Sequence, residues 1–213
     1  MKDIPVFTTE YGVASLVLSE VTCKKQAYVR LQDTRTPGEL VSECVKFCKA
    51  VGAEQVFATG HPYLETYPLY TAVCRMERST QGLPETTGYT VPVTQETFEK
   101  WRRQFNERMA AVPGAATVTM RDTDRLLSEG GCYYVCQDGR VIGLGKINKG
   151  KLEAVASLEK GGGRDTLLAL CANLGSATVS LEVACNNAAA LRLYRCLGFV
   201  QTEELLRWYQ VGD

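Results

Sequence analysis

Apolar residues recur along the chain with two spacings, and the spacing changes in the same order twice. Over residues 36–52 they fall three and four apart, which predicts an amphipathic helix. The segment Thr36-Pro37-Gly38-Glu39 has the form of a capping box with proline at the first helical position, and Gly52 is placed to end the helix. The expected inner face of this helix is Leu40, Val41, Cys44, Phe47 and Cys48.

Short runs of apolar residues flank this helix and predict strands at 26–31 and 55–59. The same order returns later, with strands expected at 152–157 and 178–183 around a helix at 164–174. A hairpin is predicted before the second copy, because Asp138-Gly139 separates the apolar runs 133–135 and 141–144. The chain therefore repeats a plan of hairpin, strand, helix and strand.

The stretch between the two copies divides the chain. Residues 77–92 are rich in Ser, Thr, Gly and Pro, and we interpret 81–92 as a linker between an N-terminal half at 1–80 and a fuller unit at 93–213. The fuller unit opens with two further helices, one capped by Thr94 and a shorter one capped by Asp122. The first of these has the inner face Phe98, Trp101, Phe105 and Met109.

Composition narrows the class of protein. The 213 residues carry 24 basic and 24 acidic side chains, and there is no basic run of the kind that binds nucleic acid. No apolar run approaches the ~20 residues needed to span a membrane, and the N-terminus lacks the apolar core of a signal peptide. We therefore expect a cytoplasmic protein with neither nucleic acid nor membrane as a partner.

The nine cysteines favour free thiols, because their number is odd and no export signal precedes them. The pairs Cys44/Cys48 and Cys132/Cys136 do not have the spacing of zinc ligands, and His61 is the single histidine. We expect no metal site.

Three consecutive glycines, Gly161-Gly162-Gly163, lie between a predicted strand and a predicted helix. Glycine lets the backbone take positive φ and lets a ligand approach, and the free N–H groups of the following helix attract anions. This pattern predicts a phosphate or pyrophosphate site, with a flexible surface loop as the alternative. The P-loop motif is absent, and the dinucleotide motif lacks its third glycine.

The last predicted helix carries polar residues at unusual places. Asn187 is a natural N-cap, Tyr194 lies near the end, and Gly198-Phe199 follows. The string N-x-x-A-x-x-L-Y-x-x-L-G-F stands complete as Asn187, Ala190, Leu193, Tyr194, Leu197, Gly198 and Phe199, and with the glycine loop it resembles the GNAT acyltransferases. The resemblance covers about residues 90–213, and it covers residues 1–80 only as a degenerate half.

The resemblance implies an α/β (α+β) fold, with a mixed, mostly antiparallel sheet flanked by helices, in a tandem arrangement. It also implies an N-acetyltransferase that uses acetyl-CoA (coenzyme A) as co-substrate and acylates the amine of a small molecule or peptide. We expect a monomer or homodimer. The N-terminal half has no glycine loop, and Thr59-Gly60-His61-Pro62 stands where the asparagine-led helix would start. We therefore expect that half not to bind coenzyme A.

The same resemblance implies roles for particular residues. Strands 152–157 and 178–183 should separate and hold the pantetheine arm in the gap. Tyr194 would be the general acid, and Glu182 or Glu153 the general base. The cofactor-binding residues would be Val155, Ala156, Ser157, Gly161, Gly162, Gly163, Arg164, Asp165 and Asn187.

One departure from the family pattern leaves alternatives open. The family loop reads [QR]-x-x-G-x-[GA]. If Gly161 and Gly163 are its glycines, Leu158 stands at the first place. If the register moves by one residue, Glu159 stands at the first place and Arg164 replaces the second glycine. A non-catalytic acyl-CoA-binding pseudoenzyme or sensor is therefore the alternative function, and an interaction scaffold is a third. The aromatic residues of the chain can line a pocket or fill a core: Trp101, Phe105, Trp208 and Tyr209.

Overall fold

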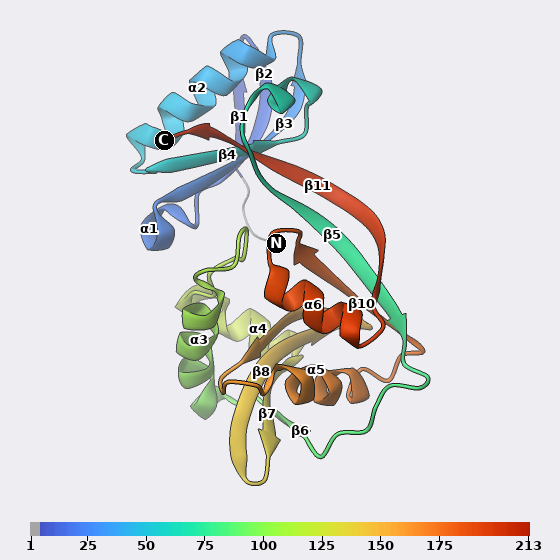
Figure 1. Cartoon of the computed structure of the whole chain (residues 1–213). Coiled ribbons are helices and arrows are strands. Elements are labelled where there is room, and N and C mark those ends of the chain that lie inside the picture. The colour runs from blue at the N-terminus through green and yellow to red at the C-terminus, as the bar shows by residue number, and fades with distance from the viewer. Residues whose placement is uncertain (1–4) are drawn as a thin grey trace. The chain divides into compact units, whose positions relative to one another are not determined.

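The computed structural model describes residues 5–213 and shows a mixed α/β protein whose strand pairs are mostly antiparallel (Figure 1). The chain forms two compact units. Unit 1 contains the residues up to Val73 together with Leu205–Asp213, and unit 2 is Cys74–Glu204. The long strands β5 (Leu69–Ser79) and β11 (Val200–Gly212) therefore contribute to both units. The fold class expected from the sequence is confirmed.

The units divide at places other than the predicted linker at 81–92. The C-terminal residues complete the sheet of unit 1, where Tyr209 pairs with Ala58 of β4 (Gln55–Thr59) and lies in the same buried cluster. The predicted linker contains strand β6 (Tyr89–Pro92), which pairs with β7 (Cys132–Gln137). Local composition misses this strand because strand formation depends on the partner as well as on the segment itself.

Unit 1 is a sheet with the strand order β1-β2-β3-β4-β11 and one long helix. Strand β3 pairs parallel with β4, whereas β1–β2, β2–β3 and β4–β11 are antiparallel. The remaining elements of the unit are β1 (Val6–Thr9), β2 (Gly12–Val17), α1 (Val21–Lys24), β3 (Gln26–Thr34), α2 (Pro37–Ala50) and the 3-10 helix η1 (Pro62–Thr66).

Helix α2 covers one face of this sheet. Alternate strand residues point into a common core with the helix: Ala14, Leu16, Ala27, Val29, Leu31, Val56 and Ala58. Four residues of the predicted inner helix face are buried there, but Phe47 is 37% exposed and packs against Phe7, with ring centroids 5.1 Å apart. The Thr36 side chain does not cap α2, so the predicted capping box is wrong.

Unit 2 has the strand order β6-β7-β8-β9-β10-β5. The hairpin predicted at Asp138-Gly139 is confirmed, with positive φ of +50° and +75° at the two turn residues, as a type I′ turn requires. The other elements are α3 (Gln95–Met109), η2 (Met120–Asp122), α4 (Thr123–Glu129), β8 (Arg140–Asn148), β9 (Lys151–Ser157), α5 (Gly163–Ala172), β10 (Thr178–Ala184) and α6 (Ala188–Cys196).

Helices cover both faces of the unit 2 sheet. Helix α5 approaches β8 closely, because a Cβ at Gly143 would lie 2.2 Å from Thr166 Oγ1 and one at Gly145 would lie 2.4 Å from Leu170 Cδ1. Leu144 points to the opposite face and packs in the cluster formed with α3 and α4. That cluster contains Phe98, Trp101, Phe105, Leu126, Tyr134, Leu144 and Ala156, so Trp101 and Phe105 fill a core.

The two helix caps predicted in this unit have different outcomes. At Thr94 a capping box forms with Thr97, and the Thr94 N–H donates to Thr97 Oγ1 at 2.9 Å. Asp122 does not cap α4, since its carboxylate instead accepts from the N–H of Thr119 at 2.9 Å and from its hydroxyl at 2.8 Å. Asp122 thus closes η2, the turn before the helix.

The expectation of free thiols is wrong for one pair of cysteines. Cys74 on β5 and Cys185, directly after β10, form a disulfide within unit 2. The partners lie 111 residues apart in sequence, so only the fold brings them together. Among the thiols that stay free, burial raises the pKa of Cys44 and of Cys171 to about 12.

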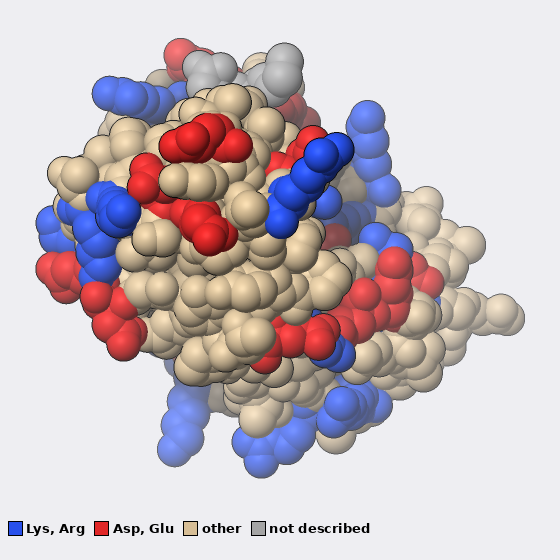
Figure 2. All heavy atoms as spheres, turned by 90° about the horizontal axis from the view of Figure 1, so that it is seen from above, with Lys and Arg blue, Asp and Glu red and all other residues tan. Residues whose placement is uncertain are grey.

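Acidic and basic side chains both lie on the face shown in Figure 2, in small groups with neither sign forming a continuous patch. This mixture accords with the balance of 24 basic and 24 acidic residues in the sequence. Within residues 5–213, no helix combines the length and the apolar character needed to cross a lipid bilayer.

Candidate functional site

The parallel strands β9 and β10 of unit 2 are paired only where they begin. The register joins Lys151 to Ser180 and Leu152 to Leu181, and it goes no further. On its other edge β9 carries a bulge, since Lys146 and Ile147 of β8 oppose Ala154 and Leu152 and leave Glu153 as the extra residue. A bulge bends a strand and increases its twist, so the strands part directly after this point. The predicted separation of the two strands is thus present in the structure.

The hydrogen bonds of β9 to β8 decide which of its main-chain groups point into the gap. The Leu158 N–H donates to the Ile142 carbonyl at 2.8 Å, which makes 142/158 and 144/156 the bonded pairs. Val155 and Ser157 stand in the alternate, non-bonded pairs and direct their N–H and C=O groups towards the β10 side. Of the three residues predicted to pair with pantetheine, Ala156 therefore directs its main-chain N–H and C=O groups to β8 and away from the gap.

The three-glycine bend joins β9 to α5. Gly161 has φ +88°, and no atom lies within 4 Å of the place where a Cβ would be. Gly162 turns its carbonyl towards the helix, where it accepts from the Thr166 N–H at 2.9 Å and from the Thr166 hydroxyl at 2.7 Å. Within residues 5–213, no carbonyl accepts from the N–H groups of Gly163, Arg164 or Asp165. The bend therefore presents amides, the arrangement that suits an anion.

Charged side chains surround this bend. Arg164 Nη1 lies 3.9 Å from Asp165 Oδ1, and the Arg164 side chain remains 51% exposed. Asp165 also accepts from the Thr86 hydroxyl at 3.2 Å, so it ties the chain before β6 to the start of α5. Lys160 has no ion pair in the described part of the chain and is exposed. Lys160 stands directly before the three glycines in the sequence, a signal that places a positive charge beside the bend.

Helix α6 begins and ends as its sequence predicts. Asn187 Oδ1 accepts from the Ala190 N–H at 3.2 Å, which confirms the N-cap. At the other end Gly198 has φ +80°, its N–H donates to the Arg195 carbonyl, and the Phe199 N–H donates to the Tyr194 carbonyl. These two bonds form a Schellman motif. Leu193 packs near Gly163, with 3.4 Å from its Cδ2 to a Cβ built there, so α6 lies beside the glycine bend.

Tyr194 lies in the core formed by α5, α6 and the sheet, and 8% of it is exposed. Burial and the nearby Cys171 thiol raise the pKa of Tyr194 to about 12. The phenol therefore stays protonated at neutral pH and is a hydrogen-bond donor. Transfer of its proton to a thiolate of pKa ~8.5 is less favourable than for a phenol of ordinary pKa near 10.

Both candidate bases form ion pairs with lysines. Glu153 lies 2.5 Å from Lys146 Nζ and also accepts from Asn148 at 2.9 Å. Burial raises the pKa of the Glu153 carboxyl, but these hydrogen bonds outweigh it and hold the pKa below its usual value. Glu182 pairs with Lys151 at 2.6 Å, and both side chains are 37% exposed. Lys151 acts on both carboxylates, since it pairs with Glu182 and also helps to lower the pKa of Glu153.

The corresponding strands of unit 1 remain paired. Strand β3 meets β4 in five successive pairs, from Gln26/Gln55 to Arg30/Thr59, and its bulge at Gln32 follows the last of them. Helix α2 starts with Pro37, which has no N–H, and a Cβ at Gly38 would lie 3.0 Å from the Tyr63 hydroxyl. Unit 1 thus offers neither the gap nor the open helix start seen in unit 2.

Comparison with solved structures identifies the fold. A GCN5-related N-acetyltransferase from Sphaerobacter thermophilus superposes with a TM-score of 0.56 at 15% identity, over 94% of this chain and 77% of that one. One from Kribbella flavida gives 0.54 at 16% identity, over 97% and 88%. A tandem GNAT protein from the clavulanic acid biosynthesis pathway gives 0.51 at 15%, over 95% and 80%. The chain has the GNAT fold.

Sequence comparison adds nothing to this result, because neither a protein-family model nor a curated protein sequence matches the chain. The structural likeness rests on the course of the backbone, since identity is 15–16% in these three cases. Among the described residues, no three His, Cys, Asp or Glu side chains gather in a way that could hold a metal ion.

Proposed function

We propose that unit 2 is an acetyl-CoA-dependent N-acetyltransferase that transfers an acetyl group to the amine of a small molecule or peptide. The observation that carries this proposal is the gap between β9 and β10, which opens at Glu153 and has the free amides of Gly163, Arg164 and Asp165 nearby in the chain. The GNAT fold supports the broader statement that the chain is an acyltransferase. The acceptor and the chemistry of the site are part of the proposal.

Main-chain groups would hold the co-substrate. Val155 and Ser157 direct N–H and C=O groups into the gap, where the amides of pantetheine can pair with them as a peptide pairs with a sheet edge. The amides of the glycine bend and the positive end of α5 would receive the pyrophosphate. Arg164 and Lys160 add positive charge beside it. Asn187 uses its Oδ1 as a helix cap and keeps its Nδ2 for the pantetheine arm.

The reaction needs one bond formed, one bond broken and two proton movements. The neutral amine nitrogen bonds to the thioester carbonyl carbon, the carbon–sulfur bond breaks, the nitrogen loses a proton, and the thiolate gains one. A main-chain N–H of β9 that contacts the carbonyl oxygen would stabilise the developing negative charge, an effect worth ~3 kcal/mol in comparable sites. Tyr194 would donate a hydrogen bond to the departing sulfur, because its phenol stays protonated.

Glu182 is the stronger candidate for the proton acceptor. Its side chain is 37% exposed, and a single ion pair with Lys151 holds it. Glu153 is tied by two partners, and its lowered pKa makes it a weaker base. In this proposal, binding of the acceptor amine displaces Lys151 from Glu182.

The engagement of both carboxylates also supports the alternative function, a non-catalytic acyl-CoA-binding module. If neither Lys146 nor Lys151 releases its partner, the site holds the thioester but has no base for the amine. The two functions predict the same affinity for coenzyme A and differ only in turnover.

Calorimetry with coenzyme A, followed by thiol release from acetyl-CoA over a panel of amines, tests both functions. We expect micromolar binding and turnover with at least one amine. Tyr194→Phe should lower kcat 10- to 100-fold with little change in the KM for acetyl-CoA, while Tyr89→Phe, an exposed site on β6, serves as the control. Binding without thiol release would establish the alternative, and absence of binding would overturn both.

A further inference from the structure

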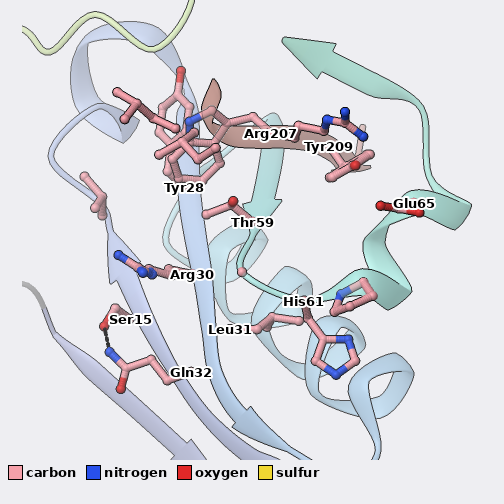
Figure 3. Close-up of a pocket in the computed structure, with 16 residues that line it drawn as sticks. Ser15, Tyr28, Arg30, Leu31, Gln32, Thr59, His61, Glu65, Arg207 and Tyr209 are labelled. Carbon is pink, nitrogen blue, oxygen red and sulfur yellow. Dashed lines mark hydrogen bonds between the residues drawn. The ribbon is translucent and has the colours of Figure 1, made fainter. Parts of the chain in front are cut away.

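Unit 1 contains a cleft on the sheet face that α2 does not cover. The cleft has a volume of about 1060 Å³, and residues of β2, β3, β4, η1 and β11 line it, all within unit 1 (Figure 3). Tyr28 and Arg30 of β3 point to this face because their neighbours Ala27, Val29 and Leu31 point into the core under α2. This face carries charged and aromatic side chains, whereas the corresponding face of unit 2 is apolar and covered by α3 and α4.

Three charged side chains line the cleft, and two of them, Arg30 and Glu65, do not compensate each other; the third is Arg207. Arg30 and Glu65 are both exposed, and neither forms an ion pair or side-chain hydrogen bond with any of residues 5–213. Figure 3 shows them on opposite sides of the cleft, with Thr59 between them.

Arg30 has hydrogen-bonding and aromatic neighbours. Thr59 stands directly opposite Arg30 in the β3–β4 register and lines the cleft. Tyr28 lies two residues from Arg30 on the same face, and its ring meets the Trp208 ring edge-on with centroids 5.1 Å apart. A guanidinium, a hydroxyl and two rings together suit a carboxylate attached to an aromatic group.

The opposite side of the cleft suits a cation or a hydrogen-bond acceptor. His61 Nδ1 accepts from the Tyr63 N–H at 3.1 Å, so the neutral ring carries its proton on Nε2. Glu65, four residues further on, presents an unpaired carboxylate. An ammonium group can therefore be held at this end while a carboxylate is held at Arg30.

We propose that the cleft of unit 1 binds a short peptide or similar elongated zwitterion, with an aromatic carboxylate end at Arg30 and an amino end at Glu65. This site does not depend on coenzyme A and is separate from the gap in unit 2. The charges on both sides distinguish such a ligand from a simple organic acid, which would satisfy Arg30 and leave Glu65 unpaired.

The test uses the full chain and the peptide series from Gly-Phe to Gly-Gly-Gly-Phe, with binding followed by calorimetry and by Trp208 fluorescence. We expect one length to bind best, at micromolar to low millimolar Kd. C-terminal amidation of that peptide should weaken binding at least 10-fold in the wild type, but less than 2-fold in Arg30→Gln. N-terminal acetylation of that peptide should weaken binding at least 10-fold in the wild type, but less than 2-fold in Glu65→Gln.

Matched variants separate the site from general charge effects. Arg140→Gln, at the start of β8, and Glu107→Gln, on α3, are exposed changes of the same kind and should leave the Kd unchanged. Trp208→Phe should abolish the fluorescence change while calorimetric binding persists. The proposal is overturned if no peptide of the series binds at 10 mM, or if the Arg30 and Glu65 variants still respond to amidation and acetylation as the wild type does.

Discussion

Units 1 and 2 follow the same order of hairpin, strand, helix and strand, yet only unit 2 opens between its parallel strands. In both, the strand after the hairpin carries a bulge, at Gln32 in β3 and at Glu153 in β9. Strands β3 and β4 of unit 1 are joined by five residue pairs, whereas β9 and β10 of unit 2 are joined by two. In each unit the pairing of the parallel strands ends before the extra residue, so the paired region is longer where that residue comes later.

The second difference is the helical layer. In unit 2, α3 and α4 cover the sheet face that carries Tyr134, Leu144 and Ala156. Unit 1 has no such helices in its described residues, and the same face carries Ser15, Arg30 and Thr59. Polar residues on that face are what a solvent-facing sheet requires. The candidate ligand site of unit 2 is thus the gap between β9 and β10, whereas that of unit 1 is the uncovered face of its sheet.

The largest expected effect concerns the disulfide, which only unit 2 contains. Reducing Cys74–Cys185 should lower the free energy of unfolding of unit 2 by about 4–5 kcal/mol, because a loop of roughly 100 residues gains conformational freedom in the unfolded chain. Urea unfolding with and without dithiothreitol measures this difference. The double variant Cys74→Ser/Cys185→Ser should not respond to the reductant, and an equal response in both proteins would contradict the prediction.

Removal of the bulge should convert unit 2 to the unit 1 arrangement. Deletion of Glu153 should let β9 and β10 pair along their length and reduce coenzyme A affinity at least 100-fold by calorimetry. Deletion of Gln32, the bulge residue of unit 1, is the matched control and should leave that affinity unchanged. If both deletions act alike, the bulge is not the cause of the gap.

Alkaline pH should act on unit 2 through Tyr194. Its folded pKa of about 12 lies above the unfolded value near 10, so its contribution to stability is complete below pH 10 and is lost as the pH rises towards 12. Tyr194→Phe should unfold with a shallower dependence on pH between 10 and 12. Buried thiols such as Cys44 in unit 1 titrate in both proteins and give the common background.

The smallest expected effect is at the glycine bend. Alanine at Gly161 must adopt φ near +88°, which costs about 1 kcal/mol and should weaken coenzyme A binding about 5-fold. Gly163→Ala places its Cβ 3.4 Å from Leu193, an ordinary contact, and should change the Kd less than 2-fold. Equal affinities for the two variants would show that the conformation of Gly161 has no part in binding.

Much of the fold and part of the candidate site could be predicted because the signals are local. Strand β4, helix α3, the Asp138-Gly139 turn and the Asn187 cap depend on residues within a few positions of one another. The glycine bend and the α6 string are equally local. Strands β5 and β11 escaped prediction, as did the cleft that β11 helps to line, since their partners lie far away in the chain.

The sequence by itself determined the local elements such as β4, α3 and the Asp138-Gly139 turn, where α6 begins and ends, and that amides follow three glycines. Only the tertiary structure decided that Cys74 forms a disulfide with Cys185 and that the last residues complete the sheet of unit 1. It also decided that lysines form ion pairs with both candidate carboxylates, and that Arg30 and Glu65 line one cleft. The physical reason is the range of the interaction. Dihedral preferences and caps act between neighbours, whereas strand register, disulfides and ion pairs form between residues that folding brings together.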